Sequence, residues 1–151
     1  MNKMDLSYFA GFFDGEGSIN ITTRQRKHFS VEHSMSISIG QKDGATLDWI
    51  KENVGGRIYI VKRDNTYFWT ASNREAERIL KLLLPYLQYK KPQAETALSF
   101  YLSKKSSRKP VKSSEIERRN SIREKLKELK HVVIKSRYAG SESKRIDPIG
   151  M

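Results

Sequence analysis

The chain has 151 residues, enough for one domain with its own core, and 29 Lys and Arg against 17 Asp and Glu give it a net charge of +12. It has no cysteine, which excludes disulfides and cysteine zinc sites. No segment is typical of a signal peptide or a membrane span, so we expect no membrane association and a cytoplasmic or organelle-encoded protein. This charge favours a polyanionic partner, and solubility alone is the simpler explanation.

The most unusual segment is Phe9–Gly17, which reads Phe-Ala-Gly-Phe-Phe-Asp-Gly-Glu-Gly. Its apolar residues cover most of the circumference of a helix, which predicts that the helix is buried. Gly11 and Gly15 are four residues apart on one face, a spacing that lets two helix backbones approach closely. Asp14 and Glu16 come at the end of the helix, where carboxylates could hold a metal ion. A core helix followed by a solvated acidic turn is the alternative.

Alternating polarity next predicts two strands, over residues 18–24 and 31–40, with a basic loop over residues 25–30 between them. A short helix is expected over residues 45–53. It is followed by a hairpin over residues 57–63 and 66–72 that turns at Asp64 and Asn65.

One face of this sheet must pack on helices, and the other carries side chains that match the chemistry of the DNA major groove. A one-sided antiparallel sheet has a polar face in any case, which is a serious alternative for the serines. It is a weaker alternative for two large aromatic residues of the last strand. The residues that we assign to the DNA-facing side are Asn20, Thr22, Arg24, Arg26, Ser34, Ser36, Ser38, Arg57, Tyr59, Arg63, Tyr67 and Trp69.

Helical periodicity predicts a helix over residues 73–84 that Pro85 ends, and Pro92 begins another that runs to about Lys104. A last amphipathic helix begins at Ser114, and the tail from Arg137 looks irregular. We therefore divide the chain into a core over residues 1–103, a basic linker over 104–113, and a basic helix and tail over 114–151 that pack on or beside the core.

Most of the excess charge lies outside the predicted core. Residues 1–102 hold 14 Lys and Arg against 11 Asp and Glu, whereas residues 103–151 hold 15 against 6. The basic linker is expected to contact phosphates, which supply affinity without sequence information. A solvated loop is the alternative. The linker residues concerned are Lys104, Lys105, Arg108 and Lys109.

Phe9–Gly17 resembles the motif of the LAGLIDADG homing endonucleases: Ala10, Gly11, Asp14 and Gly17 match it, and Glu16 takes the second acidic position. Leu84–Ala94, which reads Leu-Pro-Tyr-Leu-Gln-Tyr-Lys-Lys-Pro-Gln-Ala, resembles the second recurring segment of the same family. The resemblance covers roughly residues 5–103. It implies an α+β fold of order αββαββα(α), in which a twisted four-stranded antiparallel sheet forms a DNA-binding saddle.

The motif occurs once in the chain, and in this family a single-motif chain is implied to form a homodimer. The resemblance places the dimer interface on the motif helix, at Phe9, Gly11, Phe12 and Gly15. It also implies a divalent metal, Mg²⁺ or Mn²⁺, with Ca²⁺ as a substitute that does not support catalysis. Oxygen ligands of the kind at the end of this helix suit these ions.

Site roles follow from the same resemblance. Glu16 is expected to bind the metal directly with the Gly15 carbonyl, and Asp14 to support the site from behind by hydrogen bonds at the helix end. Lys90 corresponds to the catalytic-core lysine of the family, although a lysine after a proline turn is often merely solvated. Gln41 is the residue that we expect to orient solvent, with Lys42 or Asp43 as alternatives.

The implied activity is that of an intron-encoded, site-specific DNA endonuclease. Two Glu16 sites would each cut one strand across the minor groove of a long pseudo-palindromic target and leave 3′ overhangs. The alternatives are an intron RNA maturase, a DNA-binding regulator with the same fold but no catalysis, and a general basic nucleic-acid-binding module.

Overall fold

The computed structural model describes residues 1–26, 29–101 and 111–132. Its elements confirm the predicted α+β order, with three helices after the second hairpin. They are α1 (Lys3–Glu16), β1 (Gly17–Arg26), β2 (Phe29–Gln41), α2 (Ala45–Val54), β3 (Arg57–Val61), β4 (Thr66–Ser72), α3 (Asn73–Leu83), α4 (Lys91–Ser99) and α5 (Ser113–His131).

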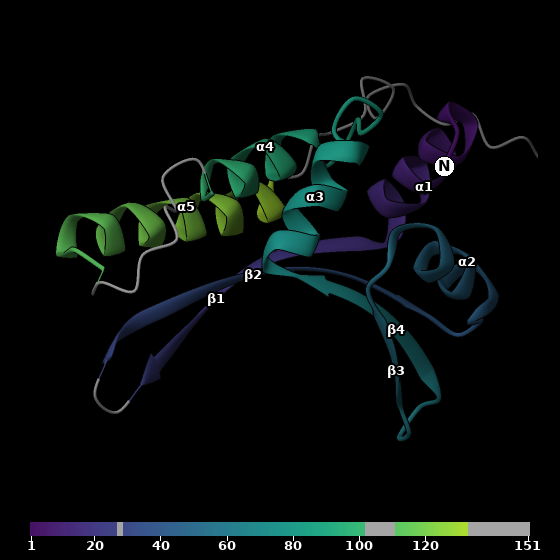
Figure 1. Ribbon diagram of the computed structural model, residues 1–151, viewed down its shortest axis with the longest axis horizontal. Helices are drawn as coiled ribbons and strands as arrows, with labels where there is room; N and C mark the ends of the chain where they lie inside the picture. Colours follow the sequence, from purple (N-terminus) through teal and green to yellow (C-terminus); the bar gives the residue numbers. More distant parts are fainter. Residues whose placement is uncertain (27–28, 102–110, 133–151) are drawn as a thin grey trace, which may run out of the picture.

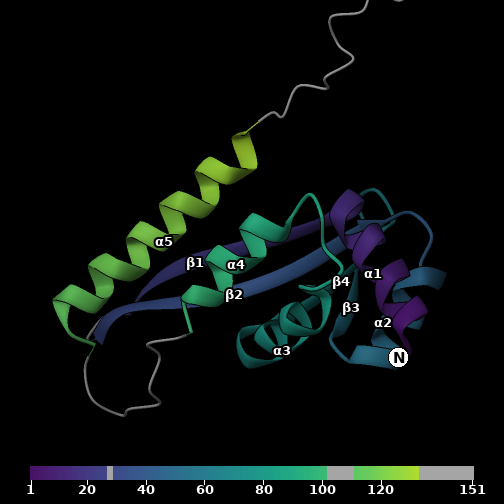
Figure 2. The same ribbon diagram turned by 90° about the horizontal axis from the view of Figure 1, so that it is seen from above.

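The four strands form one antiparallel sheet in the order β1-β2-β4-β3. The helices cover one side of the sheet, and both hairpins bend away from them, so that the open side is concave (Figure 1). Seen from above, α5 runs along the outer side of the edge strand β1 (Figure 2). The predicted saddle is therefore present.

The hydrophobic core lies between the sheet and the helices. Ile19 pairs with Ile37 and Ile21 pairs with Met35 across β1 and β2, and all four side chains are buried. The opposite residues of β2, including the three serines, alternate toward the concave side, as predicted. One side of the sheet thus carries the core while the other stays open.

Several predicted boundaries are wrong in detail. The strands β1 and β2 extend into the predicted basic loop, of which residues 27–28 lie outside the described residues. Helix α4 ends at Ser99 and not near Lys104, while the tail from Arg137 also lies outside the described part. In residues 1–26, 29–101 and 111–132, no helix is both long enough and apolar enough to cross a membrane.

Candidate active site and DNA-facing surface

Asp14 is the acid of the motif helix that faces inward. Its carboxylate accepts hydrogen bonds from three successive backbone N–H groups in the turn between α3 and α4. The distances are 2.8 Å from Gln88, 3.3 Å from Tyr89 and 2.8 Å from Lys90. Through these bonds Asp14 ties the turn to the end of α1, which is a structural task and leaves little of its carboxylate for other ligands.

Lys90 lies beside both acids and is only 8% exposed. Its ammonium group donates to the backbone carbonyl of Asp14, and it lies 5.2 Å from the centre of the Tyr89 ring. Burial lowers the pKa of Lys90, and the negative charges of Asp14 and Glu16 oppose that shift. A merely solvated lysine is thereby excluded, because the side chain is buried against the acidic end of α1.

Glu16 is the last residue of α1, and its side chain is exposed. Within the described part of the chain, no three His, Cys, Asp or Glu side chains gather into a metal cluster. A hard divalent cation such as Mg²⁺ nevertheless suits this donor set, since it binds through one or two carboxylates together with substrate phosphates and water. The exposed Glu16 carboxylate and a carbonyl at the open end of a helix are ligands of that type.

Of the three residues considered for orienting solvent, two have local structural contacts. Lys42 donates to the Asp64 carbonyl and to Thr66 Oγ1, and Asp43 accepts from the Ala45 amide at the start of α2. Gln41 ends β2, two residues beyond Ile39, which pairs with Gly17. It therefore lies at the end of the sheet where α1 joins β1, and its role stays a prediction.

The structure puts most of the predicted DNA-facing residues on the concave side. The register fixes their positions, because their neighbours in sequence point into the core. Arg26 is in β1, but its side chain is not among those described, and the linker residues Lys104, Lys105, Arg108 and Lys109 fall outside the described residues. The residues confirmed on this side are Asn20, Thr22, Arg24, Ser34, Ser36, Ser38, Arg57 and Tyr59; Arg63 is exposed in the hairpin turn.

The assignment of Trp69 and Tyr67 to the DNA-facing side is wrong. Trp69 is 0% exposed, its ring packs at 5.8 Å from that of Phe9, and its indole N–H donates to the Gly55 carbonyl at 2.8 Å. Tyr67 shares that side of β4 and packs against Gly44. The reason is register: a hairpin loop with an even number of residues pairs odd positions of β3 with even positions of β4.

Phe68 also lies on the concave side, although it is not among the predicted DNA-facing residues. It pairs with Tyr59, and the two rings stack 5.4 Å apart at an interplanar angle of 13°. A Cβ at Gly40 would come within 2.7 Å of the Phe68 ring, so glycine leaves the room that this ring needs on the sheet. Counting the even-length loop would have found Phe68.

Asn20 and Ser34 are concave-side residues whose side chains already have partners. The Asn20 side chain donates to Ser18 Oγ at 3.1 Å and accepts from the ammonium group of Lys130. Ser34 donates to the Asn73 side chain at 3.0 Å, where β4 gives way to α3. These bonds fix both side chains in the absence of DNA.

The predicted dimer interface needs one correction. Phe9 is 0% exposed and packs inside the chain against Phe13 and Trp69, so it is not available to a second copy. The opposite side of α1 is open: Met4 is 81% exposed and Tyr8 is 56% exposed. A Cβ at Gly11 or Gly15 would meet no atom within 4 Å, and Phe12 is half-buried beside them. Among the residues that the structure describes, none therefore requires glycine at positions 11 and 15.

Comparisons with known proteins agree with this geometry. The sequence profile described as "LAGLIDADG endonuclease" matches residues 9–107. The chain is 33% identical over 76 residues to the intron-encoded RNA maturase bI4 of Saccharomyces cerevisiae, which is 50% of this chain and 12% of that protein. It is 27% identical over 101 residues to the DNA endonuclease I-CreI of Chlamydomonas reinhardtii, covering 64% of this chain and 62% of that one.

Solved structures of other proteins share the fold of this chain. The homing endonuclease I-CvuI, crystallised with a DNA target and Mg, superposes with a TM-score of 0.75 at 21% identity, over 89% of this chain and 87% of the other. In sequence, I-CvuI of Chlorella vulgaris is 26% identical over 102 residues, covering 64% of this chain and 63% of that protein. The chain thus spans less than two thirds of the length of each of these curated relatives.

Proposed function

Since this chain belongs to the LAGLIDADG endonuclease family, we propose that it is a site-specific DNA endonuclease that acts as a homodimer. One observation carries the proposal: at the end of α1 an exposed carboxylate, Glu16, stands beside a buried ammonium group, Lys90. Asp14 holds that pair in place through the turn at residues 88–90.

Hydrolysis of a phosphodiester needs a placed water, neutralisation of the phosphate charge and help for the leaving oxygen. Glu16 and the Gly15 carbonyl would hold a divalent cation, which supplies all three when bound. Lys90 contributes a fixed positive charge against the negative charge that develops on the phosphate oxygens. Gln41 would orient the attacking water, which displaces the leaving oxygen as the phosphorus–oxygen bond breaks.

The homodimer follows from the open side of α1. Two copies of this helix would pack with Gly11 and Gly15 against each other, because the missing side chains allow the backbones to approach closely. That packing brings the two Glu16 carboxylates near the axis, where their repulsion favours bound cations. Each copy then cuts one strand across the minor groove, and the cuts leave 3′ overhangs.

The concave sheet of each copy would lie in the major groove of one half of a long pseudo-palindromic target. Arg, Ser and Thr side chains suit hydrogen bonds to base edges, and the stacked Tyr59 and Phe68 rings suit apolar contact with thymine methyl groups. We expect the basic linker, at Lys104, Lys105, Arg108 and Lys109, to add phosphate contacts. The cytoplasm, or an organelle that encodes the gene, is the predicted compartment.

The test uses a plasmid that carries the joined flanks of the gene's own insertion point. Wild type should convert it to linear DNA in Mg²⁺ or Mn²⁺ and bind without cutting in Ca²⁺, and sequencing of the ends should show a 3′ overhang. Glu16→Gln should bind but not cut, whereas Glu52→Gln, an exposed glutamate of α2, should cut normally. Cleavage at the wild-type rate by Glu16→Gln would disprove the metal assignment.

The similarity to an RNA maturase supports a second candidate, an RNA-binding role in intron splicing. A wild type that binds the joined DNA in Mg²⁺ but never cuts it would favour that role or a DNA-binding regulator. Splicing of the corresponding intron transcript in vitro, with and without the protein, then separates these two.

A further inference from the structure

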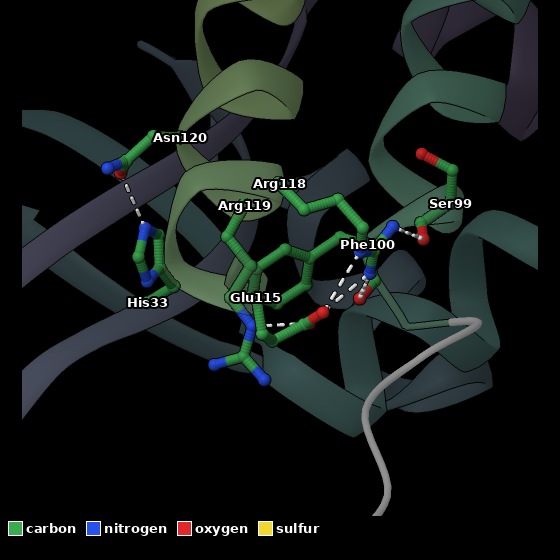
Figure 3. Close-up of polar contacts among 7 residues, drawn as sticks. All are labelled: His33, Ser99, Phe100, Glu115, Arg118, Arg119 and Asn120. Carbon is green, nitrogen blue, oxygen red and sulfur yellow. Dashed lines mark hydrogen bonds and ion pairs between the residues drawn. The ribbon is translucent and has the colours of Figure 1, made fainter. Parts of the chain in front are cut away.

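Helix α5 lies outside the residues that the family profile matches, yet the fold holds it firmly (Figure 3). The Arg118 guanidinium donates to the backbone carbonyls of Ser99 and Phe100, each at 3.3 Å. Glu115 forms ion pairs with Arg118 and Arg119 at 3.1 and 2.9 Å, and Arg119 lies 5.4 Å from the centre of the Phe100 ring. The first half of α5 is therefore clamped to the end of α4.

Further contacts carry α5 along β1. The Asn120 side chain is 2.8 Å from the ring of His33, which is buried in β2. Further along the helix, Leu126 is buried in the core, and the Arg123 guanidinium donates to the Ile21 carbonyl at 3.1 Å. The helix thereby occupies the edge of the sheet, which explains how α5 is placed but not what its last turn does.

The last turn brings a lysine to the candidate active site. The ammonium group of Lys130 donates to Asn20 Oδ1, and Asn20 donates in turn to Ser18, two residues after Glu16. Burial lowers the pKa of Lys130, and the positive charge of Lys90 lowers it further. The partner that holds Lys130 is thus a neutral amide, and its charged neighbour has the same sign.

The Asn20 amide, four residues after Glu16, holds Lys130 at the concave side of β1. A half-buried ammonium group that has another cation as its charged neighbour is unfavourable by itself, and a nearby anion removes that cost. From this arrangement we propose that Lys130 binds a phosphate oxygen of the DNA strand that the Glu16 site cuts, next to Lys90. Asn20 is then a positioning residue that aims Lys130, and not a reader of bases. This inference rests on the proposed function, because the anion is a phosphodiester of the DNA target.

A purely structural tie between α5 and β1 is the competing explanation, and it makes different predictions. Lys130→Met keeps the aliphatic stem and removes the charge, whereas Lys130→Arg keeps the charge. Lys127→Met is the matched control, since Lys127 is an exposed lysine of the same helix that pairs with Glu124. Binding to the joined-flank duplex is measured in Ca²⁺ as a function of NaCl, and single-turnover cleavage is measured in Mg²⁺.

We expect Lys130→Met to slow single-turnover cleavage by about 100-fold, the low end of the roughly 100- to 1,000-fold loss that follows removal of one donor to a transition-state charge. In a plot of log Kd against log salt concentration, the slope for this variant should be smaller by about 2. The dimer loses two phosphate contacts, and each contributes about 0.9 to the slope. Lys130→Arg should restore most of both. Asn20→Ala should lower the cleavage rate more than it weakens binding.

The outcomes separate the two proposals. If wild type cuts and Lys130→Met matches Lys127→Met in rate and salt dependence, the role of Lys130 is refuted and the proposed function stands. If neither wild type nor any variant cuts, but Lys130→Met alone has the shallower salt dependence, the phosphate contact of Lys130 is supported and the proposed endonuclease function is refuted. A wild type that neither binds nor cuts the duplex overturns both. In a further test, the phosphates near the cut are replaced one at a time with neutral methylphosphonates. At one position the replacement should slow cleavage by wild type but leave the cleavage rate of Lys130→Met unchanged.

Discussion

The structure makes its most specific prediction for the stability lost when the Asp14 side chain is removed. In Asp14→Ala, three backbone N–H groups of the turn at residues 88–90 lose their acceptor, and two of those bonds are short, at 2.8 Å. A hydrogen bond to a charged group contributes about 1.5–3 kcal/mol. Because the site is only half-buried, we take the lower value for the two short bonds and expect a loss of about 3 kcal/mol in the free energy of unfolding.

That loss is a large part of the total, which is about 5–15 kcal/mol for a domain of this kind. Urea unfolding at one fixed protein concentration measures it, with Asp48→Ala as the control for removing an exposed acid from a helix. Asp14→Asn keeps one acceptor oxygen and should lose about half as much. If Asp14→Ala unfolds within about 0.5 kcal/mol of the control, the carboxylate does not hold the turn and our account of Asp14 fails.

Three further predictions concern charge, assembly and core. Burial lowers the pKa of Lys90, so the cleavage rate should decline at a pH below the value of 10.5 that is usual for lysine. Over the same pH range the unfolded chain still carries this proton and the native state does not. Taken alone, this group therefore makes the fold more stable as the pH rises past its folded pKa. A cleavage rate that is flat up to pH 10.5 would argue against a charged Lys90 in the reaction. Gly11→Leu should give monomers in analytical ultracentrifugation without lowering the unfolding free energy of the chain, since no atom lies within 4 Å of the new Cβ, and dimers of unchanged affinity would rule out this interface. Trp69→Ala should cost about 3–5 kcal/mol in urea unfolding, and a cost below about 1 kcal/mol would place Trp69 outside the core.

The fold could be predicted from the sequence because its signals are local. Period-2 alternation put Met35, Ile37 and Ile39 on the buried side of β2, and the structure agrees. Boundaries were less certain, since the ends of β1 and β2 depend on pairing with each other. The strands continue past residues 24 and 31 because each provides hydrogen-bond partners for the other.

The side of β4 that lies on the concave face was predicted wrongly for a physical reason. Side-chain type indicated a binding surface at Trp69, whereas the register is set by the loop between β3 and β4. Trp69 has its own polar partner at Gly55 inside the chain, so burying it leaves no N–H unsatisfied. Residue type alone could not reveal that partner.

The contacts of α5 could not be predicted at all. Asn120 with His33 and Lys130 with Asn20 join residues 87 and 110 positions apart. Nothing in the local pattern of either segment signals such a pair, because helical periodicity shows which side of α5 is apolar but not which strand it meets. The basic charge of the C-terminal region therefore suggested only a general affinity for phosphates. The structure, in contrast, places Lys130 specifically against Asn20.

The separate roles of the two motif acids follow from helix geometry. With 3.6 residues per turn, positions two apart point about 200° away from each other, so Asp14 and Glu16 cannot serve the same site on one helix. The side toward the core must face the turn at residues 88–90, and the acid on that side, Asp14, satisfies its N–H groups. The other acid then has to face away from the core, toward the open end of the helix, where substrate and a second copy can reach it. Lys90 is connected to both acids, because its backbone N–H donates to Asp14 at 2.8 Å and its ammonium group feels the negative charge of Glu16 as well as that of Asp14.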